Sequence, residues 1–275
     1  NINIQKITFT GTLINRSVIY TYGFSDNTRN TLTLDSCNFL NLSQASAIDV
    51  EAYNNLYLNN CQFLNNVSHP DNPGVIRVSS VDNLLELSGC LFYNNQNTNS
   101  YGDKYGTIQL NSSSSNVDLY IDRSTFYDNG GEGSLAIRAV GSAGNRQINA
   151  TNSIFYSDII DPYTSDLNVT YSLIYNLEGT GNFYNDPLFC NVDSGDFTLY
   201  NNSPCAGTGQ NGVHIGAFDV GCGTYSGEVG SDIMVGDSPW YISATGNEFA
   251  SGSQSDPFGS FATAFDQSAS GDTIY

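Results

Sequence analysis

The sequence predicts an all-β chain whose parallel strands stack into a solenoid, and three observations support this prediction. A short segment of alternating apolar and polar residues recurs through residues 1–178 of the 275-residue chain. Aromatic and turn-forming residues are frequent, with 18 Tyr and 27 Gly, as is typical of strands joined by tight turns. Charged residues make up only 13% of the chain, whereas about a quarter is usual.

The charge balance argues against two classes of partner. The chain has 8 Lys and Arg residues against 27 Asp and Glu residues, a net charge of −19. Such a chain repels nucleic acids and anionic membrane surfaces, and no apolar run is long enough to span a bilayer. The first ten residues lack the features of a secretory signal peptide. The acidity and the low lysine content favour an extracellular or cell-surface location.

The repeated segment supplies two strands of each unit. Its pattern is apolar, polar, apolar, two polar residues, Cys or Ser, any residue, and an aromatic residue. The clearest copies are LTLDSCNFL at 32–40, LYLNNCQFL at 56–64, LELSGCLFY at 85–93 and LYIDRSTFY at 119–127, and weaker copies begin at Ile2, Ile148 and Leu167. The copies end at Phe9, Phe39, Phe63, Phe92, Phe126, Phe155 and Ile174. A unit this small buries its apolar face only by stacking on its neighbours, about 4.8 Å apart.

A third strand lies between successive copies. It reads VIYTY at 18–22, AIDVE at 47–51, VIRVS at 75–79, TIQLN at 107–111 and AIRAV at 136–140. Alternation along each strand predicts two inward columns. They are Ile2, Leu32, Leu56, Leu85, Leu119, Ile148 and Leu167, and Ile19, Ile48, Ile76, Ile108 and Ile137. We therefore predict six to seven rungs, with a ladder of stacked amides at the bend formed by Asn41, Asn65 and Asn94.

These repeats resemble the right-handed parallel β-helix of the pectin-lyase-like superfamily, over residues 1–178. The resemblance rests on the form of the repeat, so it implies the fold more than an activity. Residues 179–223 resemble the C-terminal closing segment of secreted bacterial β-helix proteins. The matching elements are DPLF at 186–189, GDFTL at 195–199, NSPC at 202–205 and IGAF at 215–218. Such a segment covers the apolar end of a solenoid and its strand edges.

The C-terminal residues resemble the start of a second β-helix. Residues 224–239 predict a linker, and residues 240–275 resemble an N-terminal cap that begins at Trp240. Phe258, Phe261 and Phe265 predict a short amphipathic helix within that cap. The chain then belongs to tandem β-helix domains, or its cap covers the open end of a neighbouring copy. The second arrangement is head-to-tail and propagates into a filament.

The six cysteines form two groups. Cys37, Cys61 and Cys90 share one inward column, where thiols act as small apolar fillers. The remaining three lie in the closing segment, where one disulfide is expected. The preferred pair is Cys205 with Cys222, and Cys190 is the alternative partner. No spacing of Cys and His predicts a zinc site.

Asp49, Glu51 and Arg77, on the outward face of the third strand, are the candidates for chemistry. The superfamily resemblance implies that polysaccharide lyases and hydrolases hold substrate on such a face. Carboxylates there act as acid and base or bind calcium, and a cationic side chain acts as base. The alternative interpretation is an ion pair between Asp49 and Arg77 on adjacent rungs. Scattered acids that could hold calcium match no calcium-binding spacing, so we expect no metal or other cofactor: Asp158, Asp161, Asp166, Asp193 and Asp196.

Exposed tyrosines are the remaining candidate feature. Tyr20, Tyr22, Tyr57 and Tyr120 are expected to point outward, where they could stack on sugar rings or contact a protein. From these features we expect a structural or adhesive module of a cell-surface protein or filament, and not an enzyme. One alternative is a polysaccharide lyase or glycoside hydrolase that acts through Asp49, Glu51 and Arg77. The other is a non-catalytic carbohydrate-binding module.

Overall fold

The computed structural model forms two compact units. Residues Asn1–Phe183 and Gly207–Asp219 form the first unit, and residues Tyr184–Ala206 and Val220–Tyr275 form the second. The closing segment expected at 179–223 is therefore divided between them. The structure describes residues 1–12, 17–21, 30–44, 46–51, 54–68, 74–78, 83–96, 106–111, 117–130, 134–140, 146–162, 166–225, 241–246, 254, 257–260, 264 and 274–275.

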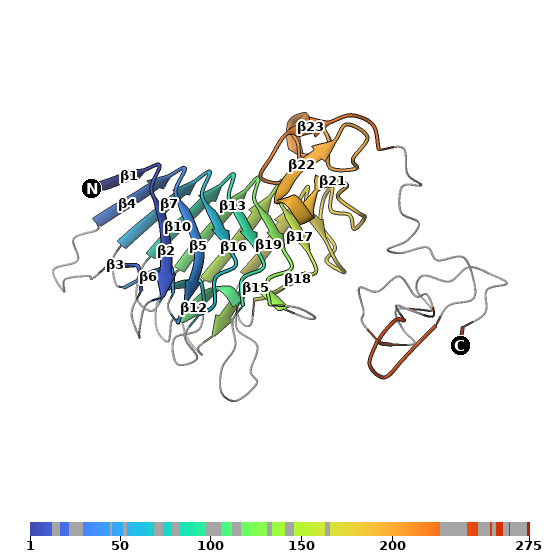
Figure 1. Cartoon of the computed structure of the whole chain (residues 1–275), viewed down its shortest axis with the longest axis horizontal. Helices are drawn as coiled ribbons and strands as arrows, with labels where there is room; N and C mark the ends of the chain where they lie inside the picture. Colours follow the sequence, from blue (N-terminus) through green and yellow to red (C-terminus); the bar gives the residue numbers. More distant parts are fainter. Residues whose placement is uncertain are drawn as a thin grey trace. The chain divides into compact units, whose positions relative to one another are not determined.

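The first unit is a solenoid of three parallel sheets, whose strands follow one another along the chain (Figure 1). Sheet A contains β1 (Ile2–Gln5), β4 (Asn30–Asp35), β7 (Asn54–Asn59), β10 (Asn83–Ser88), β13 (Val117–Asp122), β16 (Arg146–Thr151) and β19 (Asp166–Thr170). Sheet B contains β2 (Thr8–Thr12), β5 (Asn38–Ser43), β8 (Gln62–Leu64), β11 (Leu91–Tyr93), β14 (Thr125–Tyr127), β17 (Ile154–Tyr156) and β20 (Leu173–Ile174). Sheet C contains β3 (Ile19–Thr21), β6 (Ile48–Val50), β9 (Ile76–Val78), β12 (Gly106–Asn111), β15 (Ser134–Val140) and β18 (Asp158–Asp161).

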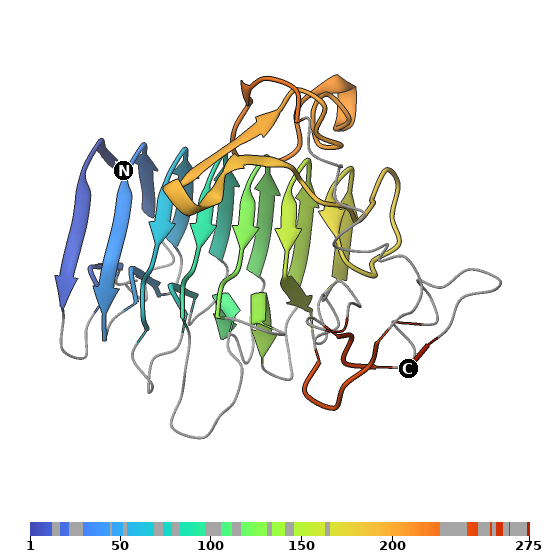
Figure 2. The same cartoon turned by 45° about the vertical axis from the view of Figure 1, so that its right-hand side comes forward.

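The register of these sheets confirms the predicted inward columns. In sheet A, Leu56 pairs with Leu85 and Leu85 with Leu119, and the same column runs from Ile2 to Leu167. In sheet C, a column of isoleucines runs from Ile19 to Ile137. Figure 2 shows the strands of successive rungs lying side by side. The seven strands of sheets A and B match the six to seven rungs expected from the sequence.

Stacked phenylalanine rings form the centre of the core. The rings of Phe39 and Phe63, and those of Phe63 and Phe92, lie 4.7 Å apart with interplanar angles of 1°. The stack continues from Phe9 to Phe155 at centroid distances between 4.5 and 5.0 Å. Parallel strands in register place each ring over the ring of the previous rung, because the rung spacing is close to the distance at which rings stack.

One residue in the left-handed conformation forms the corner between sheets A and B in each rung. These residues have φ between 43° and 65°: Lys6, Ser36, Asn60, Gly89, Arg123, Asn152 and Tyr171. The residue after each of the last six corners is a Cys or Ser that points into the core. The Ser124 hydroxyl accepts a hydrogen bond from the Cys90 amide, and the Ser153 hydroxyl accepts one from the Ser124 amide. Burial raises the pKa of the Cys90 thiol, which favours the neutral form of that side chain inside the core.

The amide ladder lies one residue away from its predicted position. Asn41, Asn65 and Asn94 adopt positive φ values between 51° and 55°, so their main role is to turn the chain; among them, Asn94 Nδ2 donates to Asn65 Oδ1 over 2.8 Å. The buried ladder instead uses the next residue in three rungs. The side-chain amides of Asn66, Asn95 and Asn129 each donate to the next residue of the ladder over 2.7–2.8 Å, and the last acceptor is Asp158.

A carboxylate stands at the end of this ladder because that position needs only an acceptor. Every amide donates its N–H towards the next rung, so the last acceptor receives hydrogen bonds but has none to pass on. Asp158 is 2% exposed and accepts from both the backbone and the side-chain nitrogen of Asn129. Buried polar groups are stable when their hydrogen bonds are satisfied. The ladder therefore ties successive rungs together inside the fold.

The second unit contains a small sheet and the C-terminal segment. The sheet has the order β21 (Phe189–Asn191), β22 (Asp196–Tyr200) and β23 (Val220–Cys222). Further on, Ile242 forms a parallel bridge with Phe258, and its amide donates to the carbonyl of Tyr275 over 2.8 Å. Of the amphipathic helix expected at 258–265, the described residues 258–260 are not helical, since Phe258 forms a β-bridge, and residues 261–263 and 265 lie outside the described residues. Of its residues after 260, only Ala264 is described, with helical backbone.

The stacked core predicts how stability varies along the solenoid. Phe92 is fully buried between two rings, so Phe92→Ala should destabilise the fold by about 3–5 kcal/mol. The matched variant Phe9→Ala should cost less than half as much, because Phe9 is only partly buried and its ring contact is with Phe39. Urea unfolding followed by circular dichroism measures both changes. Equal shifts in the two urea midpoints would contradict the stacked core.

Candidate functional site

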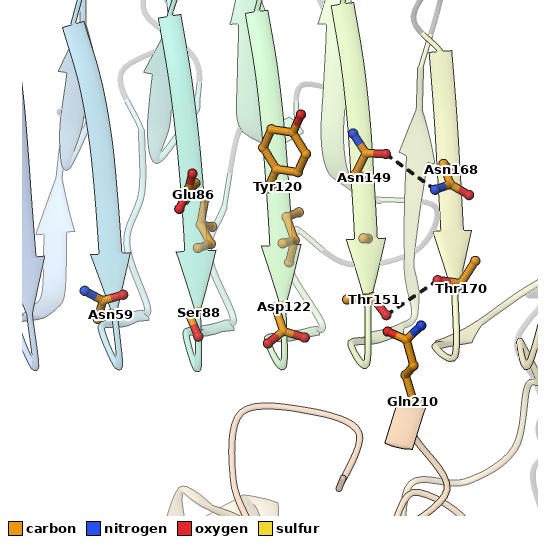
Figure 3. A pocket seen from close by; sticks show the side chains of 13 residues that line it. Asn59, Glu86, Ser88, Tyr120, Asp122, Asn149, Thr151, Asn168, Thr170 and Gln210 are labelled. Atoms are coloured by element: carbon orange, nitrogen blue, oxygen red, sulfur yellow. Dashed lines mark hydrogen bonds between the residues drawn. The ribbon is translucent and has the colours of Figure 1, made fainter. Parts of the chain in front are cut away.

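A polar groove lies on the outward face of sheet A (Figure 3). Its volume is about 350 Å³, within the usual range for ligand sites. Its side chains come from five successive strands, β7, β10, β13, β16 and β19, and from Gln210 in the segment between β22 and β23. The lining side chains that point outward are Asn59, Glu86, Ser88, Tyr120, Asp122, Asn149, Thr151, Asn168, Thr170 and Gln210.

The register of sheet A arranges these side chains in two rows. In the first row, Glu86 lies beside Tyr120, Tyr120 beside Asn149, and Asn149 beside Asn168. The second row runs from Asn59 through Ser88 and Asp122 to Thr151 and Thr170. The inward columns of the same strands fix these positions, because a shift by one residue would exchange the two faces. The groove is thus a consequence of the core register.

Gln210, in the segment 207–219, forms one wall of the groove. The Gln210 amide donates to Asn152 Oδ1 over 2.7 Å, and the Gly216 amide donates to the Asn152 carbonyl over 2.8 Å. The Ala217 amide donates to Thr125 Oγ1 over 3.0 Å. Glycine is required at 209, because a Cβ there would lie 2.7 Å from Asn152 Oδ1. Asn152 therefore anchors the segment that turns a flat sheet face into a groove.

Asn152 also orients one of the two carboxylates in the groove. Its Nδ2 donates to Asp122 Oδ1 over 3.0 Å, while Arg123 Nε lies 3.4 Å from Asp122 Oδ2. Asp122 is thus held at the base of the wall, whereas Glu86 is exposed on the open sheet. Tyr120 is 41% exposed and lies between Glu86 and Asn149. The groove combines one aromatic ring with amides, hydroxyls and two carboxylates.

Sheet C places two of the three residues proposed for chemistry in direct contact. Asp49 and Arg77 pair on adjacent strands, with Asp49 Oδ1 3.6 Å from Arg77 Nε. Asp49 is buried, with 8% exposure. Farther along the same column, Arg138 Nε lies 3.8 Å from Asp161 Oδ2. The ion pair between rungs that the sequence offered as an alternative is therefore present. Glu51 follows β6 and is half-buried.

This outward column of sheet C is largely shielded from solvent. Gln109 lies between Arg77 and Arg138 and is fully buried, and Gly106 to Leu110 in β12 are all buried. Gln109 Nε2 donates to Asn111 Oδ1 over 2.8 Å, and its Oε1 accepts from the Gly106 amide. Tyr20, at the start of the column, is exposed. The column thus serves to bind rungs together along most of its length.

Three of the five acids considered for calcium have other roles in the structure. Asp158 ends the amide ladder and Asp161 faces Arg138, while Asp196 Oδ1 accepts hydrogen bonds from the amide and hydroxyl of Thr198. Within the described part of the chain, no three His, Cys, Asp or Glu side chains gather in a way that could hold a metal ion.

The structure differs from the preferred disulfide pairing. Cys190 on β21 is bonded to Cys222 on β23, with Cα atoms 6.1 Å apart, a distance that suits a disulfide. Both strands flank β22, which brings the two cysteines together. Cys205 is instead a buried thiol in the turn after β22, and burial raises the pKa of that thiol. Cys190, which the sequence offered as the alternative partner, therefore forms the disulfide with Cys222.

The residues expected to form a cap are only partly described. Phe258 is fully buried and packs with Ala264, Ile242 and Ile274 in a small apolar cluster. Trp240, Phe261 and Phe265 lie outside the described residues, as does Tyr22. The rings of Tyr241 and Tyr275 stack at 5.4 Å. The backbone at Phe258 and the backbone at Tyr275 thus both lie beside Ile242, as neighbouring strands do.

Sequence reasoning identified Tyr57 and Tyr120 as outward residues of sheet A but did not find the groove. Alternation along the strand was the available signal for Glu86, Asn149 and Asn168, which occupy the same row as the tyrosines. No sequence pattern indicated that residues 207–219 lie beside sheet A. Their anchor is one asparagine, Asn152, at a corner position that every rung contains.

Comparisons with other proteins do not assign this chain to a family. No protein-family model matches it, and no curated protein matches it with significance. In the described residues, no helix is both long enough and apolar enough to cross a membrane. The interpretation of the groove therefore depends on its own geometry and chemistry.

The disulfide assignment makes a direct prediction. Alkylation of the denatured, unreduced chain should modify the four cysteines that carry free thiols, Cys37, Cys61, Cys90 and Cys205. Mass spectrometry of a peptic digest should then find the peptides of Cys190 and Cys222 linked. In the folded protein at pH 8, Cys205 should resist iodoacetamide, because its raised pKa and burial keep the thiol protonated and inaccessible. A linked peptide that contains Cys205 would overturn the assignment.

Proposed function

We propose that this chain is a structural and adhesive module of an extracellular surface protein, built on a β-solenoid of the pectin-lyase-like superfamily. The module binds its ligand on the outward face of sheet A and does not transform it. The proposal rests on one observation: the outward faces of sheets C and A have different roles. Sheet C uses its charged side chains to join rungs, while sheet A presents a hollowed polar surface.

The state of Asp49 and Arg77 favours binding over catalysis. A general acid or base must reach the substrate, yet Asp49 is buried and its carboxylate faces Arg77. The repeated pair of Arg138 and Asp161 gives the same column a structural role. The polysaccharide lyase or hydrolase remains the second candidate, since Glu51 and Arg77 are only partly buried.

The first rung supports a role in end-to-end stacking. β1, β2 and β3 are the edge strands of the three sheets, and Ile2 is 63% exposed beside Tyr20 at 53%. A hollow of about 400 Å³ at this end is lined by Ile2, Ile4, Ile19, Tyr20 and Leu32, among others. Edge strands with apolar side chains pair with further strands. We propose that the 241–275 segment of another copy pairs with them.

Turnover distinguishes the module from the enzyme. We expect the intact chain and Asp49→Asn to release no new reducing ends from neutral or acidic polysaccharides, because Asp49 serves an ion pair and not a reaction. The measurement is reducing-end analysis with chromatography of the products. Chain cleavage by the wild type that is lost in Asp49→Asn would establish the enzyme instead.

Electron microscopy tests the stacking of copies. The intact chain should form end-to-end fibres, and two changes should leave single particles: Ile2→Lys, which charges the receiving end, and removal of the residues after Gly223. Glu86→Lys is the matched control for stacking, because Glu86 is exposed on β10, an interior strand of sheet A away from both ends of the solenoid. Single particles from every version would show that copies do not cap one another.

A further inference from the structure

We propose that a small polar pocket at the corner between sheets A and B binds a free α-amino acid with a short side chain. The pocket has a volume of about 290 Å³ and lies within the first unit. One side comes from corner residues of the solenoid, and the other comes from the 207–219 segment. It shares no lining residue with the groove on sheet A, so it is a separate site with a ligand of its own.

The pocket exists because a glycine interrupts the column of corner residues. Asn60, Gly89 and Arg123 occupy the corner on three successive rungs, so Asn60 and Arg123 start about 10 Å apart, at two intervals of about 4.8 Å. Gly89 leaves a notch between these two long side chains, because a Cβ there would lie 2.6 Å from Asn60 Oδ1. Gly89 is the single glycine among the seven corner residues, all of which the structure describes.

Arg123 supplies the positive charge of the pocket. Its Nε lies 3.4 Å from Asp122 Oδ2, and its side chain is 51% exposed. A strong charge-assisted hydrogen bond is shorter, about 2.7–2.9 Å, so Asp122 holds the guanidinium only weakly. The contact is made through Nε, whereas the guanidinium presents its donors as a planar fork. Its terminal nitrogens are therefore suited to a carboxylate ligand.

His214 supplies a second donor from the 207–219 segment. Its Nδ1 accepts a hydrogen bond from the Gly207 amide over 2.9 Å. In a neutral imidazole the other nitrogen then carries the proton, so Nε2 is a donor. The side chain is half-buried and lines the pocket. The Gly216 amide, which donates to the Asn152 carbonyl over 2.8 Å, holds this segment on the solenoid, so the wall is already in place before a ligand binds.

Asp219 supplies the negative charge of the same pocket. It lines the pocket and is exposed at the end of the 207–219 segment, where its carboxylate can pair with an ammonium group. An α-amino acid carries a carboxylate and an ammonium group on one carbon atom, which matches a pocket lined by groups of both signs. The proposed orientation places the ligand carboxylate at Arg123 and His214 and its ammonium group at Asp219.

The charge of the whole chain favours a zwitterion over a simple anion. The net charge of −19 repels anions at long range, and Asp219 repels them inside the pocket. A molecule without net charge avoids the long-range repulsion, while its carboxylate still pairs with Arg123. A divalent cation fits less well, because Arg123 lines the pocket and, among the residues that the structure describes, no three His, Cys, Asp or Glu side chains gather to hold a metal ion.

The size of the pocket and its apolar part indicate a ligand with a short side chain. A volume of about 290 Å³ lies at the lower end of the usual range for ligand sites. Val213 and Ala217 are the apolar side chains among the described lining residues, and both are half-buried. They offer a surface for a methyl or hydroxymethyl group, whereas an aromatic side chain would find little to pack against. L-Alanine and L-serine are therefore the expected ligands within this class.

NMR titration of the intact chain tests the proposal. The probes are L-alanine and L-serine, with acetate and ethylamine as molecules that carry only one of the two charges. At least one of the two amino acids should bind with a Kd on the order of 1 mM or tighter and should shift the amide signals of Gly216 and Ala217. Acetate and ethylamine should bind at least tenfold more weakly, because each can pair with only one of Arg123 and Asp219.

Substitution of the arginine locates the carboxylate. Arg123→Asn should weaken amino-acid binding at least tenfold, and asparagine suits this left-handed corner because it already occupies the same corner at positions 60 and 152. Lys6→Asn is the matched control, since it removes a positive charge from the same corner of the first rung and should change the Kd less than twofold. Thermal melts confirm that both variants are folded.

Two further variants test the ammonium partner and the notch. Asp219→Asn should also weaken binding at least tenfold, whereas Asp193→Asn, at an exposed acid outside the pocket, should change the Kd less than twofold. Gly89→Asn leaves every charge in place but fills the notch, and it should weaken binding at least tenfold. The atom that a new Cβ meets there is the end of the Asn60 side chain, which can turn away, so the corner itself is retained.

Three outcomes would overturn the inference. They are no binding of either amino acid, acetate binding as tight as that of the amino acids, and equal weakening in Arg123→Asn and Lys6→Asn. Tight binding of acetate would identify a site for simple anions instead. None of these outcomes bears on the proposed function, which depends on the outward face of sheet A and on the first rung of the solenoid.

Discussion

Each rung must place its side chains directly over those of the rung before it, because parallel strands in register lie only about 4.8 Å apart. This constraint explains the phenylalanine stack, the aliphatic columns and the buried ladder from Asn66 to Asp158. A residue suits the core only if it packs or hydrogen-bonds well against a copy of itself or a close substitute. The outward face inherits the same order, so the rows of the sheet A groove follow from the register of the core.

Several polar side chains of the described residues join the rungs or line the groove. Asp49 with Arg77 and Arg138 with Asp161 join neighbouring strands of sheet C. Asn152 does both, since it forms a left-handed corner of the solenoid and holds the wall at 207–219. Its side chain connects Asp122 to the Gln210 backbone. The groove is therefore fixed by the same corners that direct the chain from sheet A to sheet B.

Local repetition made the solenoid predictable, whereas isolated contacts made its details unpredictable. The alternation in LYLNNCQFL and its relatives defines which residues point inward, so the columns from Ile2 and Ile19 follow from the sequence alone. The predicted contact between Asn65 and Asn94 is present, but the buried ladder uses Asn66 and Asn95, because the first residue of each pair turns the chain. The disulfide joins Cys190 to Cys222, which depends on strand order in a sheet without repeats. The wall of the groove likewise depends on contacts between residues more than fifty positions apart.

The central claim is that sheet A, and not sheet C, is the face that meets the ligand. The most direct test is a crystal structure of the chain soaked with neutral and acidic oligosaccharides. The account predicts that any bound saccharide is intact and lies on sheet A, across β7, β10, β13, β16 and β19. A sugar bound beside Asp49 and Arg77 on sheet C, or a cleaved product on either face, would contradict it.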